Sequence, residues 1–353
     1  MMPMHRWIDL RSDTVTRPTL EMLEYMMKAE VGDDVFGEDP TINELQRYAA
    51  DMFGKENALF CPSGTMSNQI AIRLHTQPGD EVICDIHSHI YHYETGGMAV
   101  HSGVQPKLIV TDNGIITAAQ IEPLINPYAD WLTRTSLVVI ENTCNRAGGT
   151  YYDLKTIKEI FDLTRKYSLK LHIDGARIFN AIVENDYTTK DIGKYCDTVS
   201  VCLSKGLGAP VGTLLIGSKE DIFKARRIRK QMGGGMRQAG ILAAAGLYAL
   251  KHHIDDLKID HIKAKRLYDV LKNCDYVKSI KPVYTNIVIF ELKDDVNPLA
   301  FEQKLLEESV KISSFGKHVV RMVTHRDVTE EDINKVVEVL NELEKKDIVG
   351  RFD

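Results

Sequence analysis

Short apolar runs recur along the first two thirds of the chain and alternate with stretches whose apolar residues have helical spacing. Several runs are apolar at nearly every position, which is typical of strands buried on both faces of a parallel sheet. The predicted strands are residues 58–60, 81–84, 107–110, 137–141, 170–173, 198–203 and 213–216. This alternation of strand and helix indicates βαβ units.

Helical spacing is clearest in two of the intervening stretches. Residues 41–53 place Ile42, Leu45 and Ala49 on one face, and residues 154–167 repeat the pattern. After about residue 239 the alternation stops. The later pattern predicts a long charged helical region over about residues 251–273, short strands at 286–292 and 319–324, and a closing helix from 331 to about 345.

We therefore predict an α/β fold in two parts. The large domain, residues 1–250, holds an N-terminal arm and a mostly parallel seven-stranded sheet between helices. A smaller α+β C-terminal domain covers residues 251–353. A length of 353 residues, with 44% hydrophobic and 27% charged residues, suits a soluble protein with a substantial core.

Charge and cysteine usage narrow the classes of function. A formal net charge of −6 argues against a broad basic surface for nucleic acid. No apolar run is long enough to span a bilayer, and residues 1–13 contain no apolar core of a secretory signal. The cysteines form no CxxC pair, which favours free thiols in a reducing compartment, so we expect a cytoplasmic protein. They are Cys61, Cys84, Cys144, Cys196, Cys202 and Cys274.

Lys205 carries the strongest local signal for chemistry. It directly follows the apolar run 198–203 and precedes a turn with Gly206 and Gly208. Partial desolvation at such a strand end lowers the pKa of the lysine amine, so that the unprotonated amine can act as a nucleophile. Such a lysine suits a Schiff base with an aldehyde cofactor. A lysine that simply extends out of a strand end gives the same pattern, so the motif alone leaves both interpretations open.

Asp174 and Arg177 follow another apolar strand, at residues 170–173. An acid at the carboxyl end of a parallel strand faces the crevice where α/β proteins bind ligands. In an enzyme that uses pyridoxal phosphate (PLP), such an acid keeps the pyridine nitrogen protonated. Arg177 lies close enough in sequence to bind an anionic oxygen of cofactor or substrate. An ordinary aspartate in a strand-to-helix turn is the alternative.

Two further segments follow predicted strands. Ser63, Gly64 and Thr65 form a small polar turn before a helical pattern, and such a turn can hold a phosphate. A cap without a ligand is equally ordinary there. His89 belongs to a histidine cluster that also contains His87 and lacks the HExxH spacing and nearby cysteine ligands, so we expect no metal site. An imidazole stacked on a cofactor ring is the better functional interpretation.

Taken together, seven segments in order resemble the low-specificity L-threonine aldolases, which belong to PLP fold type I, the aspartate aminotransferase-like superfamily. The resemblance covers nearly the whole chain. The segments are residues 8–18, 31–40, 141–146, 172–180, 203–208, 233–238 and 320–325.

The resemblance implies a role for each matching residue. Lys205 would carry the cofactor, Asp174 would pair with the pyridine nitrogen and His89 would stack on the ring. The remaining cofactor contacts implied are Ser63, Gly64, Thr65, Arg177 and Arg237, and the substrate contacts are Ser12, Arg177 and Arg321. A homotetramer with active sites at subunit interfaces is implied as well, with Arg237 reaching a neighbouring subunit's cofactor.

The activity implied is cleavage of L-threonine, L-allo-threonine or both to glycine and acetaldehyde, by retro-aldol scission of the Cα–Cβ bond. The alternative is a PLP aminotransferase or a β-eliminating lyase, since these share the lysine, aspartate and arginine. The chain departs from the family pattern at Phe36, Trp131 and Cys144, where tyrosine, histidine and histidine are usual. Trp131 leaves open the preference between threonine and allo-threonine and the identity of the general base, for which we suggest His89.

Overall fold

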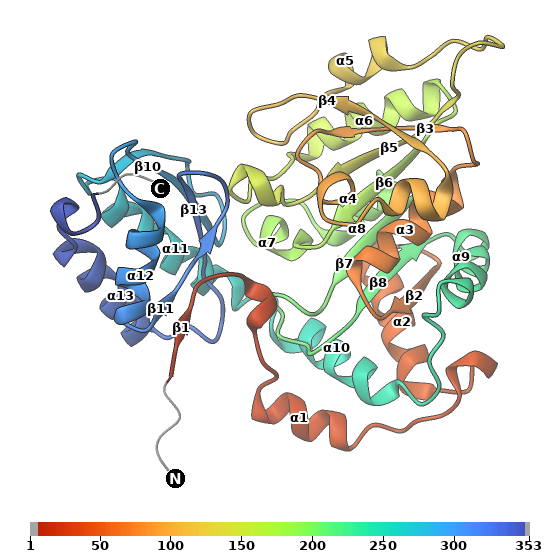
Figure 1. Ribbon diagram of the computed structural model, residues 1–353. Helices are drawn as coiled ribbons and strands as arrows, with labels where there is room; N and C mark the ends of the chain where they lie inside the picture. Colours follow the sequence, from red (N-terminus) through yellow and green to blue (C-terminus); the bar gives the residue numbers. More distant parts are fainter. Residues whose placement is uncertain (1–5, 350–353) are drawn as a thin grey trace.

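A seven-stranded sheet forms the centre of the computed structural model, which describes residues 6–349 (Figure 1). Its strand order is β2-β8-β7-β6-β5-β3-β4, and β8 alone runs against its neighbours. The strands are β2 (Asn57–Cys61), β3 (Glu81–Asp85), β4 (Gln105–Ile109), β5 (Thr135–Glu141), β6 (Lys170–Gly175), β7 (Thr198–Cys202) and β8 (Thr213–Gly217). Each overlaps one run predicted from the sequence, so the predicted α/β architecture is confirmed.

Helices cover both faces of this sheet, as the unbroken apolar runs require. Successive residues of β8 show the division: Leu214 and Ile216 pack with one group of helices, and Leu215 packs with α3 and α9 on the other face. The first group includes α2, α6, α8 and α10. These helices are α2 (Pro40–Phe53), α3 (Gly64–His75), α6 (Leu154–Lys166), α8 (Thr189–Lys194), α9 (Lys219–Gln231) and α10 (Gly240–His252).

Shorter helices complete this part of the chain. They are α1 (Leu20–Met27), α4 (His89–His92), α5 (Ala118–Ile121) and α7 (Ile178–Ile182). No helix among residues 6–349 is both long and apolar enough to cross a membrane. All the cysteines are free thiols, and only Cys274 is not fully buried.

A second, antiparallel sheet lies in the C-terminal part, in the order β12-β13-β10-β9. Its strands are β9 (Val277–Ile280), β10 (Ile287–Leu292), β12 (Ser313–Ser314) and β13 (Val319–Val323). The helices α11 (Leu257–Leu271), α12 (Pro298–Glu307) and α13 (Glu330–Glu342) pack with it around a separate apolar core. The sequence pattern indicated β10, β13, α11 and α13 but neither α12 nor the shorter strands.

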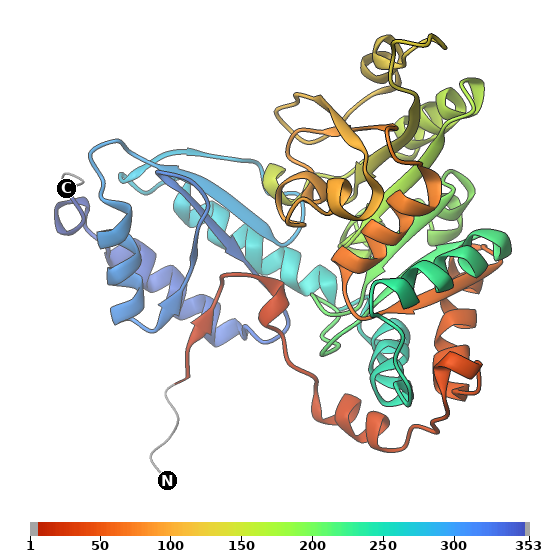
Figure 2. The same cartoon turned by 45° about the vertical axis from the view of Figure 1, so that its right-hand side comes forward.

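The N-terminal segment joins this C-terminal part. β1 (Ile8–Asp9) pairs in parallel with β11 (Val310–Lys311), and Ile8 and Leu10 enter the C-terminal apolar core. The segment that follows β1 passes between the two parts of the molecule (Figure 2). Residues near both ends of the sequence are therefore brought to the carboxyl-terminal edge of the large sheet.

Candidate active site

A cavity of about 480 Å³ lies at this edge, between the large sheet and the C-terminal part. Five residues singled out in the sequence line it: Ser12, His89, Arg177, Lys205 and Arg321. They come from five separate segments, which only the fold brings together. The other lining residues are Thr14, Tyr93, Asn145, Ser313, Ser314 and Phe315.

Lys205 is half-buried and reaches the cavity from the turn that follows β7. Its carbonyl oxygen accepts hydrogen bonds from Thr16 Oγ1 at 2.8 Å and from the backbone N–H of Gly208 at 2.8 Å. Gly208 has a φ of +78°, a conformation that glycine adopts without strain. This turn fixes the backbone from which the amine extends.

Asp174 is buried near the end of β6, where it is 2% exposed. Its Oδ2 accepts a hydrogen bond from Asn68 Nδ2 at 2.8 Å, and its Oδ1 accepts one from the backbone N–H of Ala176 at 3.1 Å. Asn68 in turn accepts from His172, whose Nε2 lies 3.1 Å from Asn68 Oδ1. The sequence singled out Asp174, but only the fold reveals the amide and imidazole that support it.

His89 begins α4 and is held at two points. Its Nδ1 lies 3.0 Å from Oε1 of Glu94, and its backbone N–H donates to Glu141 Oε2 at 2.7 Å. Burial lowers the pKa of His89, but the hydrogen bond to Glu94 and the negative charges around it outweigh burial and raise the pKa above its ordinary value. The imidazole is therefore more basic than a free histidine side chain.

Glu141, at the end of β5, is also unusual in its protonation. Burial, and then the nearby charge of Asp174, raise the pKa of Glu141 to about 7, against the opposing effect of two backbone hydrogen bonds. Those bonds come from His89 and from Asn145, at 2.7 and 2.8 Å. The carboxyl group thus ties two segments of the cavity wall to the sheet.

Arg177 is bound on one side by Asp13, and both side chains are buried at 7% and 0% exposure. Its Nε donates to Asp13 Oδ2 at 2.8 Å and its Nη2 donates to Oδ1 at 2.6 Å. Burial opposes ionisation of Asp13, but the Arg177 charge holds the pKa of this carboxyl far below its usual range. Asp13 does not engage Nη1, so that end of the guanidinium is available to a ligand anion.

Arg321 lies on the facing wall of the cavity, on β13 of the C-terminal sheet. Its Nη1 donates to Asn145 Oδ1 at 2.8 Å and its Nη2 donates to the carbonyl of Arg11 at 3.0 Å. Burial, and then the positive charge of Arg177, lower the pKa of Arg321 to about 10. Two arginines that raise each other's electrostatic energy form a site that favours an anion.

Ser63, Gly64 and Thr65 form the N-terminus of α3, where Ser63 Oγ accepts a hydrogen bond from the backbone N–H of Met66 at 3.2 Å. The start of this helix lies against β7 and β8, because a Cβ on Gly64 would stand 2.8 Å from Cys202 Sγ. A helix N-terminus of this kind suits a phosphate. These residues do not line the cavity that Lys205 lines.

Arg237 lies apart from the cavity. It is exposed, and its Nη1 donates to Asp33 Oδ2 at 2.8 Å. Within one chain the structure therefore does not bring Arg237 together with Lys205 and His89.

Comparison with known proteins identifies the family. Residues 9–295 match the family model described as beta-eliminating lyase. The low specificity L-threonine aldolase of Escherichia coli K12 is 43% identical over 330 residues, which cover 93% of this chain and 97% of that protein. The chain belongs to the low-specificity L-threonine aldolase family. Low-specificity L-threonine aldolase 1 of Arabidopsis thaliana is 40% identical over 93% of this chain and 94% of that protein.

Solved structures agree with this fold. A Leishmania major threonine aldolase superposes with a TM-score of 0.82 at 22% identity, covering 94% of this chain and 98% of that chain. Serine palmitoyltransferase of Sphingomonas wittichii gives 0.74 at 16% identity, with coverage of 96% and 87%. The family and the fold class expected from the sequence are both confirmed.

Several residues of this aldolase family site were not singled out by the sequence. Asp13, Glu94, Glu141 and Asn145 all contact a lining residue. Asp13, Glu141 and Asn145 do lie within segments of the family resemblance, and a further signal lay in Asn68 and its neighbours, which are polar residues on the buried face of an apolar-periodic helix. Such residues need buried partners.

The three departures from the family pattern lie in different surroundings. Trp131 is 84% exposed and does not line the cavity of its own chain. Phe36 is 73% exposed. Cys144 is buried, and its Sγ lies 3.0 Å from the carbonyl oxygen of Glu141, consistent with a packing role.

His89, Glu94 and Asp174 have ligand atoms within 4.8 Å of one another, a spacing that a metal ion can use. The surrounding donors oppose this use. Asn68 Nδ2 donates to both carboxylates, at 2.9 and 2.8 Å, and Gln69 Nε2 donates to Glu94 at 2.6 Å. N–H groups that point at the same oxygens compete with a cation for them.

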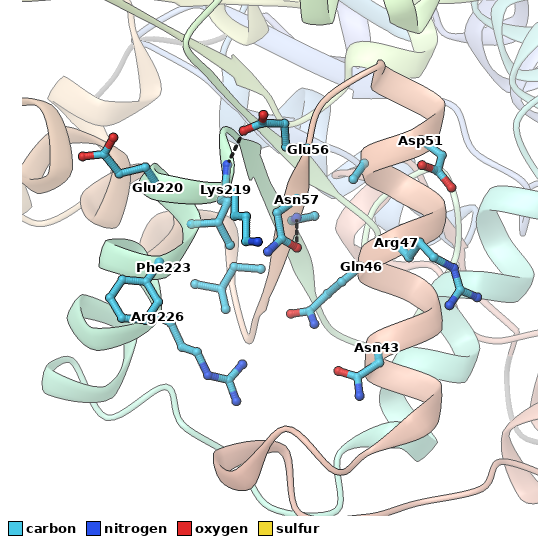
Figure 3. A pocket seen from close by; sticks show the side chains of 14 residues that line it. Asn43, Gln46, Arg47, Asp51, Glu56, Asn57, Lys219, Glu220, Phe223 and Arg226 are labelled. Atoms are coloured by element: carbon cyan, nitrogen blue, oxygen red, sulfur yellow. Dashed lines mark hydrogen bonds between the residues drawn. The ribbon is translucent and has the colours of Figure 1, made fainter.

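A larger cavity, of about 880 Å³, lies elsewhere, between α2 and α9 beside the edge strand β2 (Figure 3). Its wall mixes side chains of both charges, including Arg47 and Asp51 on α2 and Glu220 and Arg226 on α9. None of the residues that the sequence singled out for chemistry lines it. Size therefore does not identify the reactive site in this molecule, whereas the convergence of amine, imidazole and guanidinium groups does.

Proposed function

We propose that this protein is a PLP-dependent aldolase that cleaves L-threonine, L-allo-threonine or both into glycine and acetaldehyde. The observation that carries the proposal is the single cavity lined by Lys205, His89, Arg177 and Arg321. An amine, a basic imidazole and two guanidinium groups suit an amino-acid substrate whose carboxylate is held while its β-hydroxyl is deprotonated.

The residues around the cavity fit PLP. We propose that Lys205 bonds covalently to the cofactor aldehyde, that Asp174 pairs with the pyridine nitrogen and that His89 stacks on the ring. The buried carboxylate of Asp174 has no arginine or lysine in an ion pair with it among residues 6–349, as expected for a partner of a cationic ring nitrogen. When bound, PLP supplies an electron sink for the charge that develops at Cα.

We propose a separate set of residues for the phosphate group of PLP. Ser63, Gly64 and Thr65 offer the N-terminus of α3. We place Arg237 at the cofactor of a neighbouring subunit, because its own chain keeps it away from the cavity while leaving it exposed.

The substrate carboxylate is proposed to bind between Arg177, Arg321 and Ser12. Asp13 holds Nε and Nη2 of Arg177, which would leave Nη1 to bind the carboxylate. With the carboxylate fixed at one end, the two arginines would orient the Cα–Cβ bond of the substrate for cleavage, a positioning effect. His89 then accepts the proton of the β-hydroxyl as acetaldehyde leaves.

We further propose a homotetramer with active sites at subunit interfaces, located in the cytoplasm and acting in threonine catabolism and glycine formation. The division into a large domain of residues 1–250 and a small domain of residues 251–353 is part of the same proposal. The two separate apolar cores support it, although β1 from the N-terminal arm contributes to the second core.

Incubation of the purified protein with L-threonine and, separately, with L-allo-threonine tests the proposal. Release of acetaldehyde and glycine in equal amounts is expected. A 2-keto acid as product would favour an aminotransferase or β-eliminating lyase instead. Borohydride reduction should fix the cofactor to Lys205 in the wild type and leave Lys205→Ala unlabelled, as read by mass spectrometry of the peptide.

A further inference from the structure

Glu94 is a buried acid directly beside the cavity, and its side chain is 0% exposed. Among residues 6–349, the only basic side chain in an ion pair with it is His89. Its carboxylate accepts three hydrogen bonds: from Asn68 Nδ2 at 2.9 Å, from Gln69 Nε2 at 2.6 Å and from His89 Nδ1 at 3.0 Å.

The orientation of the Asn68 amide indicates the charge of Glu94. On the far side of Asn68, Oδ1 faces Nε2 of His172 at 3.1 Å, and Nδ1 of His172 faces Thr198 Oγ1 at 2.9 Å. Burial lowers the pKa of His172 to about 4, so this imidazole is neutral and one nitrogen carries its proton. Asn68 Oδ1 can only accept, so Nε2 of His172 is the nitrogen that carries the proton, and Nδ1 accepts from the Thr198 hydroxyl.

With Oδ1 of Asn68 used in this way, both Nδ2 hydrogens point at carboxylates, one at Glu94 and one at Asp174. Gln69 adds another N–H donor to Glu94. A carboxylate surrounded by donors is an ionised acceptor. The nitrogen of His89 that faces it must therefore carry a hydrogen.

We propose that Glu94 is a positioning residue: it holds the proton on Nδ1 of His89 and so makes Nε2 the nitrogen that exchanges a proton with the substrate. This inference rests on the proposed function, because it concerns the base of that reaction. The arrangement uses the same physical logic as a carboxylate that fixes the tautomer of a catalytic histidine in a hydrolase.

The charges that face His89 agree with this role. Burial lowers the pKa of His89, whereas the hydrogen bond to Glu94 and the charges of Asp174, Glu94 and Glu141 raise it, with a net increase. The neighbouring ring of Tyr93 lies 5.4 Å away between centroids. Three basic residues line the same cavity: Lys205, Arg177 and Arg321.

The test uses Glu94→Gln, which keeps the size of the side chain and removes its charge. We expect the plateau of kcat/KM to fall by about 10- to 100-fold, since a complete loss of a general base costs about 10²–10⁴. The midpoint of the acid limb of the pH profile should move to lower pH, because the charge that raises the pKa of His89 is gone. Glu94→Asp keeps the charge, so its kcat/KM plateau and its pH midpoint should both lie between those of Glu94→Gln and of the wild type.

Asp85→Asn is the matched control. Asp85 is also a buried acid, at 5% exposure, and it accepts hydrogen bonds from His87 and Thr111 rather than from His89. The Asp85→Asn variant should leave the pH midpoint of the kcat/KM profile unchanged. If Glu94→Gln and wild type share the same midpoint and the same plateau, the proposal is overturned.

A second measurement does not depend on turnover. Diethyl pyrocarbonate modifies the unprotonated imidazole, and the His89 side chain is 31% exposed. The modification rate of the His89 peptide, followed against pH by mass spectrometry in the full chain with and without cofactor, should have a lower midpoint in Glu94→Gln and an intermediate one in Glu94→Asp. An unchanged midpoint in both variants would again overturn the role of Glu94.

The two proposals can fail separately. If the wild type releases acetaldehyde from neither L-threonine nor L-allo-threonine, the proposed function is wrong, while the modification profile still reports on the His89–Glu94 pair. A double-mutant cycle applies if acetaldehyde is released. If Glu94→Gln lowers the rate by the same factor in the wild-type background and in the His89→Asn background, Glu94 acts independently of His89 and its positioning role is refuted.

Discussion

Replacing Asp13 with asparagine should destabilise this protein strongly, because it removes the counter-charge of a buried arginine. Asp13 is 0% exposed and Arg177 is 7% exposed, and they share hydrogen bonds of 2.6 and 2.8 Å. Removing one partner of such a pair leaves an uncompensated buried charge and costs about 3–5 kcal/mol. An asparagine also presents an N–H group to one guanidinium nitrogen, so one charge-assisted hydrogen bond is lost.

The assay is urea unfolding followed by circular dichroism at a fixed protein concentration, since assembly changes apparent stability. Asp269→Asn serves as the control. Its pair with Lys272 is 52% and 43% exposed, and an exposed pair contributes about 0–1 kcal/mol. If Asp13→Asn and Asp269→Asn lose the same free energy of unfolding, the reasoning about burial is wrong.

The pH dependence gives a second check on Asp13. Its folded-state pKa lies below the ordinary value of 3.8, so its stabilisation is complete above that pH and is lost as the pH falls further. The difference in stability between wild type and Asp13→Asn should therefore be constant near neutral pH and shrink in acid below about pH 4. A difference that grows in acid would contradict the assigned direction of the shift.

Two further outcomes follow from the same geometry. Arg321→Lys should raise KM for the amino acid by roughly 10-fold or more with a smaller change in kcat, measured by steady-state kinetics, because a lysine cannot reproduce the planar contacts of arginine; an unchanged KM would remove Arg321 from the carboxylate site. Gly64→Ala should destabilise the protein by about 1–3 kcal/mol in urea unfolding, because its Cβ would stand 2.8 Å from Cys202 Sγ. Adding Cys202→Ala should recover part of that loss, and no recovery would show that the contact is not the cause.

The sequence by itself determined the secondary-structure elements of the large sheet and most of the candidate reactive residues. Unbroken apolar runs can be satisfied only by strands covered on both faces, so all seven strands of the large sheet could be predicted from residues 57 to 217. Lys205 and Asp174 were identifiable because each follows such a run, and parallel strands bring their carboxyl ends to one edge. The family resemblance alone supplied Ser12 and Arg321, whereas His89 and Arg177 were also identifiable from their places after predicted strands; all four line one cavity with Lys205.

Only the tertiary structure decided which partners these groups have. β1 pairs with β11 across about three hundred residues, and a two-residue strand carries no periodic signal. The bonds of Asp13 to Arg177 and of Glu94 to Asn68 likewise join separate segments. Charge state and tautomer depend on burial and on the donors that surround a group, and those are properties of the folded chain rather than of any local stretch of sequence.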